Sequence, residues 1–113
     1  VLSMRMMLTA HIPHEPFNSL VRDGSAGKRI QEIVAATKPE AVYFTEQNGT
    51  RCAVLIVNLD KPSGVPALVE PWFLTFEADC EVRIVMSPED LAQVLPPYTG
   101  TQRWMGRQMR RIL

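Results

Sequence analysis

The stretch EAVYFTEQNGTRCAVLIVNLD, Glu40 to Asp60, decides the fold because it predicts a β-hairpin. Asn48 and Gly49 separate two runs rich in β-branched and aromatic residues, and both central residues of such a turn need a positive φ. The second run, RCAVLIVNL, is apolar on both of its faces. A strand of this kind lies in the centre of a sheet and is covered on both sides.

Two further strands flank the hairpin in the sequence. In MRMMLTAHI (4–12) the even-numbered residues are all apolar, whereas the odd-numbered ones include Thr9 and His11. In CEVRIVM (80–86) the charged residues Glu81 and Arg83 alternate with apolar ones. An alternation with a period of two predicts half-buried strands.

Apolar residues at helical spacing predict helices between these strands. They cover HEPFNSLVRDG (14–24), SAGKRIQEIVAATKP (25–39) and a third segment around Val69 to Phe76, and SPEDLAQVL (87–95) adds a short last helix. Ser25 and Ser87 are expected to be N-caps. Pro71 inside the third segment predicts a kink or a break.

The order strand, helix, strand, strand, helix, strand is the βαββαβ pattern of a ferredoxin-like α+β fold. We expect this domain to span residues 1–95. Residues 96–113 are expected to form a basic tail that begins with proline, contains a last helical piece and is not a separate domain. Helices usually cover only one face of such a sheet. Because the central strand is apolar on both faces, we expect a second copy to cover the open face, sheet against sheet, in a two-fold homodimer.

The charge is unevenly divided between these two parts. All 12 acidic residues precede Pro96, whereas the tail has four arginines and no acid. The tail is therefore expected either to dock on protein, within one chain or between two, or to stay partly disordered. Cys52 and Cys80 give no disulfide framework, and no apolar run approaches the roughly 20 residues of a membrane helix. We expect a reduced, cytoplasmic protein with no membrane partner.

Three stretches, RDGSAGKRIQEIV (22–34), KPEAVYFTEQNGTR (38–51) and VMSPEDL (85–91), resemble small uncharacterised bacterial proteins of the dimeric α/β-barrel superfamily. The superfamily includes muconolactone isomerase, the antibiotic-biosynthesis monooxygenases and the stress-responsive barrel proteins. The resemblance covers about residues 4–95 and implies two ferredoxin-like domains that pair through their sheets. It implies no particular activity, because no catalytic motif of these families matches this chain.

Candidate site residues lie on the expected open face. His11, at the end of the first strand, either looks into a cleft, where a histidine serves as acid or base, or is a hydrogen-bonded strand-end residue. Thr9 shares its face, and the hairpin adds either Tyr43 or Phe44. Arg83 would hold an anionic or oxygenated ligand.

Two of these assignments have competing interpretations. Arg83 can instead pair with Glu81 or with a carboxylate of a partner chain. Trp72 is expected to pack over the sheet, and the alternative makes it the wall of a ligand pocket.

We expect no metal, because His11 and His14 stand on opposite sides of Pro13 and lack a third ligand. Cys52, which starts the strand after the hairpin, is expected to be distant from both. We also expect no cofactor. A nucleic-acid partner is not expected, because RCAVLIVNL lacks the aromatic residues on which RNA-recognition motifs stack bases, although the arginine-rich tail with Trp104 leaves that alternative open.

The sequence thus predicts a dimeric barrel protein that binds a small organic or anionic ligand, with cofactor-free isomerase or monooxygenase-like chemistry as a possible extension. In that reading His11 is the acid–base group, and Thr9, Tyr43, Arg83 and Trp72 contact the ligand. The alternative is a non-catalytic interaction or regulatory module that uses its basic tail.

Overall fold

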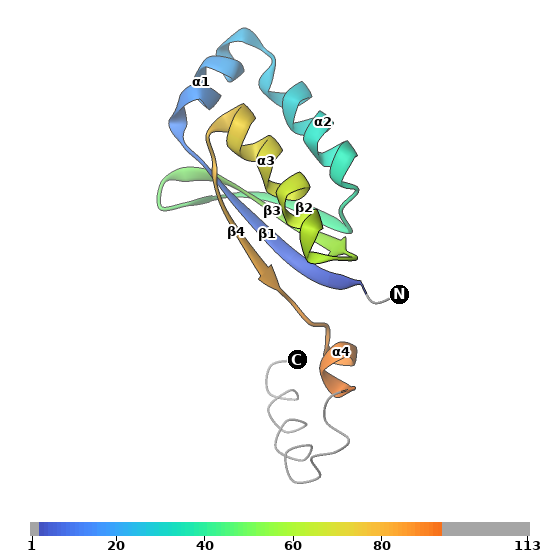
Figure 1. The fold of residues 1–113 in the computed structure, drawn as a ribbon. Helices are drawn as coiled ribbons and strands as arrows, with labels where there is room; N and C mark the ends of the chain where they lie inside the picture. Colours follow the sequence, from blue (N-terminus) through green and yellow to red (C-terminus); the bar gives the residue numbers. More distant parts are fainter. Residues whose placement is uncertain (1–2, 94–113) are drawn as a thin grey trace.

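A computed structural model describes residues 3–93 as a four-stranded antiparallel sheet with helices packed on it (Figure 1). The elements are β1 (Met4–Ile12), α1 (His14–Asp23), α2 (Ala26–Thr37), β2 (Ala41–Gln47), β3 (Thr50–Leu59), α3 (Val65–Phe76), β4 (Asp79–Ile84) and α4 (Pro88–Ala92), with a short 3-10 turn (Pro62–Gly64) before α3. The strands lie in the order β2-β3-β1-β4. This order and the βαββαβ succession confirm the predicted ferredoxin-like α+β fold. The predicted tail, 96–113, lies outside the described residues.

The hairpin turn has the conformation that its sequence predicts. Asn48 has a φ of 55° and Gly49 a φ of 81°, both in the left-handed region. Asparagine and glycine tolerate this region better than other residues. The turn fixes the pairing of β2 with β3, in which Gln47 faces Thr50 and Tyr43 faces Val54.

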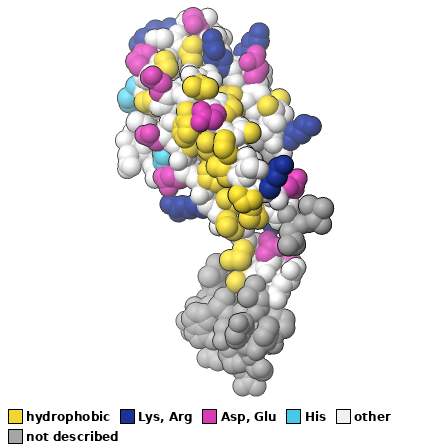
Figure 2. Space-filling view, in the orientation of Figure 1, with side chains coloured by type: hydrophobic (Ala, Val, Ile, Leu, Met, Phe, Trp, Pro, Cys, Tyr) yellow, Lys and Arg dark blue, Asp and Glu magenta, His cyan; other side chains and the backbone are white. Residues whose placement is uncertain are grey.

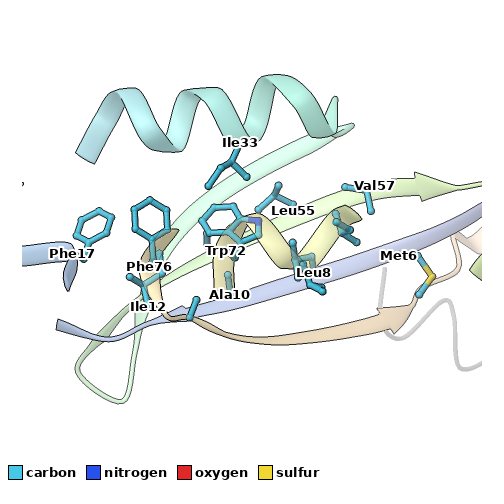
Figure 3. Close-up of a cluster of buried hydrophobic side chains, with 14 of the residues drawn as sticks. Met6, Leu8, Ala10, Ile12, Phe17, Ile33, Leu55, Val57, Trp72 and Phe76 are labelled. Carbon is cyan, nitrogen blue, oxygen red and sulfur yellow. The ribbon is translucent and has the colours of Figure 1, made fainter. Parts of the chain in front are cut away.

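The hydrophobic core lies between the sheet and the three longer helices (Figure 3). The even-numbered residues of β1 meet the odd-numbered residues of β3, so that Leu8 and Leu55 are directly opposite and both fully buried. Trp72 and Phe76 of α3 pack on this layer, with their ring centroids 5.8 Å apart. Full burial of a side chain of this size contributes about 1.5–3 kcal/mol.

Of the kink or break predicted at Pro71, the break is wrong. Helix α3 runs from Val65 to Phe76 through this residue. Proline at this position removes the hydrogen bond to the carbonyl of Ala67, one turn earlier. Ala67 is exposed, so that water can bond this carbonyl, and the burial of Trp72 and Phe76 holds the helix in place.

The two predicted caps differ in the structure. The Ser87 hydroxyl accepts a hydrogen bond from the Asp90 amide at 3.0 Å, and the Asp90 carboxylate accepts one from the Ser87 amide, which together form a capping box. Ser25 occupies the N-cap position of α2, but its hydroxyl makes no capping bond. The hydrogen bond at this turn comes instead from the Ser25 backbone amide, which donates to the Asp23 carboxylate at 2.8 Å.

No helix within residues 3–93 is long and apolar enough to cross a membrane.

Candidate functional site

The sheet has one face without a helix over it among the described residues, and we call this the open face (Figure 1). Because paired residues of neighbouring strands point to the same side, the register assigns its members. Three rows cross all four strands: Ala41, Ile56, Met7 and Arg83; then Tyr43, Val54, Thr9 and Glu81; then Thr45, Cys52, His11 and Asp79. The pairs Arg5 with Asn58 and Gln47 with Thr50 lie on the same face, beyond these rows. Four of the five predicted site residues, His11, Thr9, Tyr43 and Arg83, are therefore on one face, and Phe44 is on the other.

His11 lies beside a carboxylate from the neighbouring strand. Its Nε2 atom is 2.9 Å from Oε1 of Glu81. The other Glu81 oxygen, Oε2, accepts a hydrogen bond from the Arg83 guanidinium at 2.9 Å. Glu81 thus connects His11 and Arg83 into one cluster, which we call the His11–Glu81–Arg83 cluster.

The cluster keeps Glu81 ionised. Its pKa lies below the ordinary 4.5, chiefly because of the hydrogen bond with His11 and then that from Arg83. An ionised carboxylate only accepts hydrogen bonds, so the His11 Nε2 atom carries the proton in this contact. Arg83 is paired with Glu81, which is the alternative to anion binding that the sequence offered for this arginine.

Thr9 and Tyr43 are in the same row as Glu81 but at increasing distance from it. Thr9 is directly opposite Glu81, with Val54 on its other side. Tyr43 is three strands away, or about 14 Å at the usual strand spacing. Its side chain is 65% exposed. A ligand would have to be extended to touch both Tyr43 and the cluster.

Trp72 is not part of this arrangement. It lies on the helix side of the sheet with no exposed surface, among residues of the core (Figure 3). The sheet itself separates it from His11. Its indole N–H has no hydrogen-bond partner among the described residues. The structure therefore does not bring Trp72 together with the other four predicted residues.

Cys52 is adjacent to His11, and the expectation that it would be distant is wrong. The start of β3 pairs with the end of β1, which puts the two residues directly opposite. Cys52 is nevertheless buried, and burial raises the pKa of its thiol. Cys80 lies on the helix side of the sheet, and burial raises the pKa of its thiol to about 11. Within residues 3–93 no group of three or more histidine, cysteine or acidic side chains is arranged to hold a metal ion.

A second polar cluster, at the end of the open face away from His11, was not predicted from the sequence. The Arg5 guanidinium donates to Glu40 at 3.1 Å and to Asp90 at 3.0 Å. Asn58 also donates to Glu40, at 2.7 Å, and this bond is the largest cause of the lowered pKa of Glu40. The only sequence signal was the place of Arg5 on the same face as His11. Its partners come from a loop and from α4.

The cavities described by the structure are small. One of about 270 Å³ lies beside this second cluster and is lined by Ser3, Met4, Arg5, Asn58, Ile84, Val85, Met86 and Asp90. Another, of about 290 Å³, lies on the helix side between α2, α3 and the end of β3, and apolar residues such as Ile33 and Leu68 dominate its lining. Ligand sites usually combine such an apolar wall with several convergent polar groups. The polar residues that line the helix-side cavity are Thr37 and Asn58, and their side chains already donate to the Ile33 carbonyl and to Glu40. Neither of these two cavities is lined by His11, Thr9, Tyr43 or Glu81.

No known protein family matches the chain, and no curated protein is similar to it. Among solved structures, the chain is similar to the "De novo designed protein Ferredog-Diesel", with 11% sequence identity and a TM-score of 0.44 over 74% of this chain and 87% of the designed one. The ferredoxin-like assignment does not depend on this likeness, since it follows from the strand order.

Proposed function

We propose that the protein is a homodimer of the dimeric α/β-barrel kind, which pairs through its open faces and holds a small organic molecule between them. The observation that carries this proposal is the composition of the open face. Its central strands carry the apolar Met7, Val54 and Ile56, which are half-buried in the single chain. The His11–Glu81–Arg83 cluster lies along the β4 side of this face, and the Arg5 cluster lies at one end of it. An apolar middle with a polar rim is typical of a protein interface.

The His11–Glu81–Arg83 cluster bears on the charge of the bound molecule. Glu81 neutralises Arg83 and is itself ionised. An anionic ligand would have to displace Glu81 from Arg83 and would meet its negative charge. A neutral, oxygenated organic molecule fits better, because the Thr9 hydroxyl lies opposite Glu81 and the neighbouring residues are apolar, while the Tyr43 hydroxyl is within reach of an extended molecule only. His11 is the group that would exchange a proton with this molecule if the protein turns it over.

The pairing is tested by the solution mass, measured by light scattering on a sizing column. Ile56→Glu puts a charge in the middle of the open face and is expected to halve the mass of the assembly. Val21→Glu is a matched control, because it introduces the same charge at an exposed apolar residue of α1, on the helix side. If Ile56→Glu leaves the mass unchanged, the sheet-to-sheet pairing is refuted. The same measurement on a chain that ends at residue 95 separates this pairing from a clasp made by the basic tail.

Ligand binding is tested by thermal stabilisation with two small probes, phenol and benzoate. Phenol is expected to raise the unfolding temperature more than benzoate does. Glu81→Gln frees Arg83 from its carboxylate and is expected to reverse this preference in favour of benzoate. His11→Ala should abolish the effect of either probe, and an unchanged shift in that variant would remove His11 from the site.

A further inference from the structure

The outer edge of β4 carries a charge pattern that is complementary to itself. In the described part of the chain β4 is an edge strand, with β1 on one side and no strand on the other (Figure 1). An edge strand presents unpaired backbone groups to any other strand that can approach. Only three charged residues lie on β4: Asp79, Glu81 and Arg83.

The direction of the backbone groups can be read from the pairing with β1. The Val85 amide donates to the Arg5 carbonyl at 2.9 Å, in line with the register that pairs Met7 with Arg83. In an antiparallel pair, alternate residues direct both backbone groups to the same side. The odd-numbered residues of this strand therefore bond β1, and Cys80, Val82 and Ile84 direct their N–H and C=O groups outward.

We propose that a second copy of the chain pairs along this edge, β4 against β4 in antiparallel orientation, about a two-fold axis at Val82. This register uses all of the outward backbone groups, because Val82 bonds the partner's Val82 and Cys80 bonds the partner's Ile84. It also places Glu81 opposite the partner's Arg83 in the closely spaced, non-hydrogen-bonded positions. The two sheets then form one continuous sheet of eight strands.

Charge selects this register over its neighbours. A two-fold axis at Glu81 would put two glutamates directly opposite each other, and an axis at Arg83 would do the same with two arginines. Like charges directly opposite are unfavourable, whereas opposite charges stabilise a strand pair. An axis at Glu81 would also pair Asp79 with the partner's Arg83, but it keeps the two glutamates opposite each other. Of these three axes, only the one at Val82 forms attractive pairs and leaves no like charges directly opposite. The other edge strand, β2, has Glu46 as its only charged residue and offers no such selection.

The helix side of this edge is apolar and exposed. Ile84 is 65% exposed and lies on the same side as α3. Helix α3 packs over β1 and β4. Its residues Ala67 and Pro71 face α2, where they line a cavity. Phe73 is on the opposite side of the helix from them, which is the side away from α2. Figure 2 shows a band of hydrophobic side chains that runs over α3 and along β4. Pairing along β4 would join this band to that of the second copy, which gives the contact an apolar side as well as charged pairs.

The edge contact uses a different surface from the open-face pairing, and the two together close into an assembly of four chains where their two-fold axes meet at right angles. The test therefore uses the full chain with Ile56→Glu, which removes the open-face contact. In this background sedimentation velocity is expected to detect a dimer. Glu81→Arg and Arg83→Glu, each added alone, place like charges opposite each other twice and should weaken the dimer about tenfold or more.

An equimolar mixture of these two variants provides the sharpest result. One chain then has arginine at both positions and the other has glutamate at both, so the mixture is expected to form a heterodimer although neither chain pairs with itself. A monomeric Ile56→Glu chain refutes the edge contact, and so does a mixture that stays monomeric. If Ile56→Glu leaves the mass of the wild type unchanged, the open-face pairing fails instead, so the two failures can be told apart.

Discussion

Replacing Trp72 with phenylalanine separates a role in the core from a role in ligand binding. Trp72 has no exposed surface, and its indole N–H has no partner among the described residues. The smaller ring removes roughly three heavy atoms, which costs about 2–2.5 kcal/mol at about 0.8 kcal/mol per buried CH₂-sized group. It also removes the unsatisfied N–H, whose burial costs about 1–3 kcal/mol. These effects oppose each other, and we expect the free energy of unfolding to change by less than about 1.5 kcal/mol.

Trp72→Ala is the matched comparison, because it leaves a cavity and should cost about 3–5 kcal/mol. That is a large part of the roughly 5–15 kcal/mol by which a small domain is stable. Urea unfolding followed by far-ultraviolet circular dichroism measures both variants without relying on tryptophan fluorescence. A phenylalanine variant as unstable as the alanine variant would refute the reasoning, since the indole N–H would then have to make a stabilising bond. Loss of phenol binding in Trp72→Phe, with stability retained, would return Trp72 to the ligand site.

Three further predictions concern local features. Gly49→Ala is expected to cost about 1–2 kcal/mol, because a left-handed φ is unfavourable for a residue with a Cβ, and the thermal midpoint measures this. The pKa of Glu40 is lowered by the hydrogen bond from Asn58 and then by Arg5, so the stability it contributes is present above its ordinary pKa of 4.5 and is lost as the pH falls through the lower folded value. Asn58→Ala should therefore show a shallower fall of the unfolding temperature between about pH 5 and pH 3 than the wild type, and equal slopes would contradict the assignment. Both thiols are expected to react slowly with a disulfide reagent at about pH 8 in the folded protein and quickly in urea. The reason is that burial raises the pKa of Cys80 to about 11 and also raises the pKa of Cys52. Fast labelling of either thiol without urea would show that it is accessible.

The open face was largely predictable because it depends on the alternation of side chains along a strand. Thr9, His11 and Arg83 lie on the face that the period of two assigns to them. Tyr43 rather than Phe44 shares this face, and the sequence left that choice open because one position in the register decides it. The adjacency of His11 and Cys52 was missed because it arises from antiparallel pairing of residues 41 positions apart in the chain, which no local pattern encodes.

The sequence by itself determined the elements whose cause is local. The Asn48-Gly49 turn, the alternation in β1 and β4 and the capping box at Ser87 each depend on residues within a few positions of one another. Tertiary structure decided the rest. Burial of Trp72 and Phe76 keeps α3 helical through Pro71, although proline disfavours a helix interior. Strand register brings Glu81 beside His11, and the same carboxylate also pairs with Arg83. The sequence predicted that Arg83 would bind an anionic ligand, but the negative charge of Glu81 offsets the charge of this arginine. The physical reason is the same in both cases: the energy of a buried ring or an ion pair depends on neighbours that only the folded chain brings together.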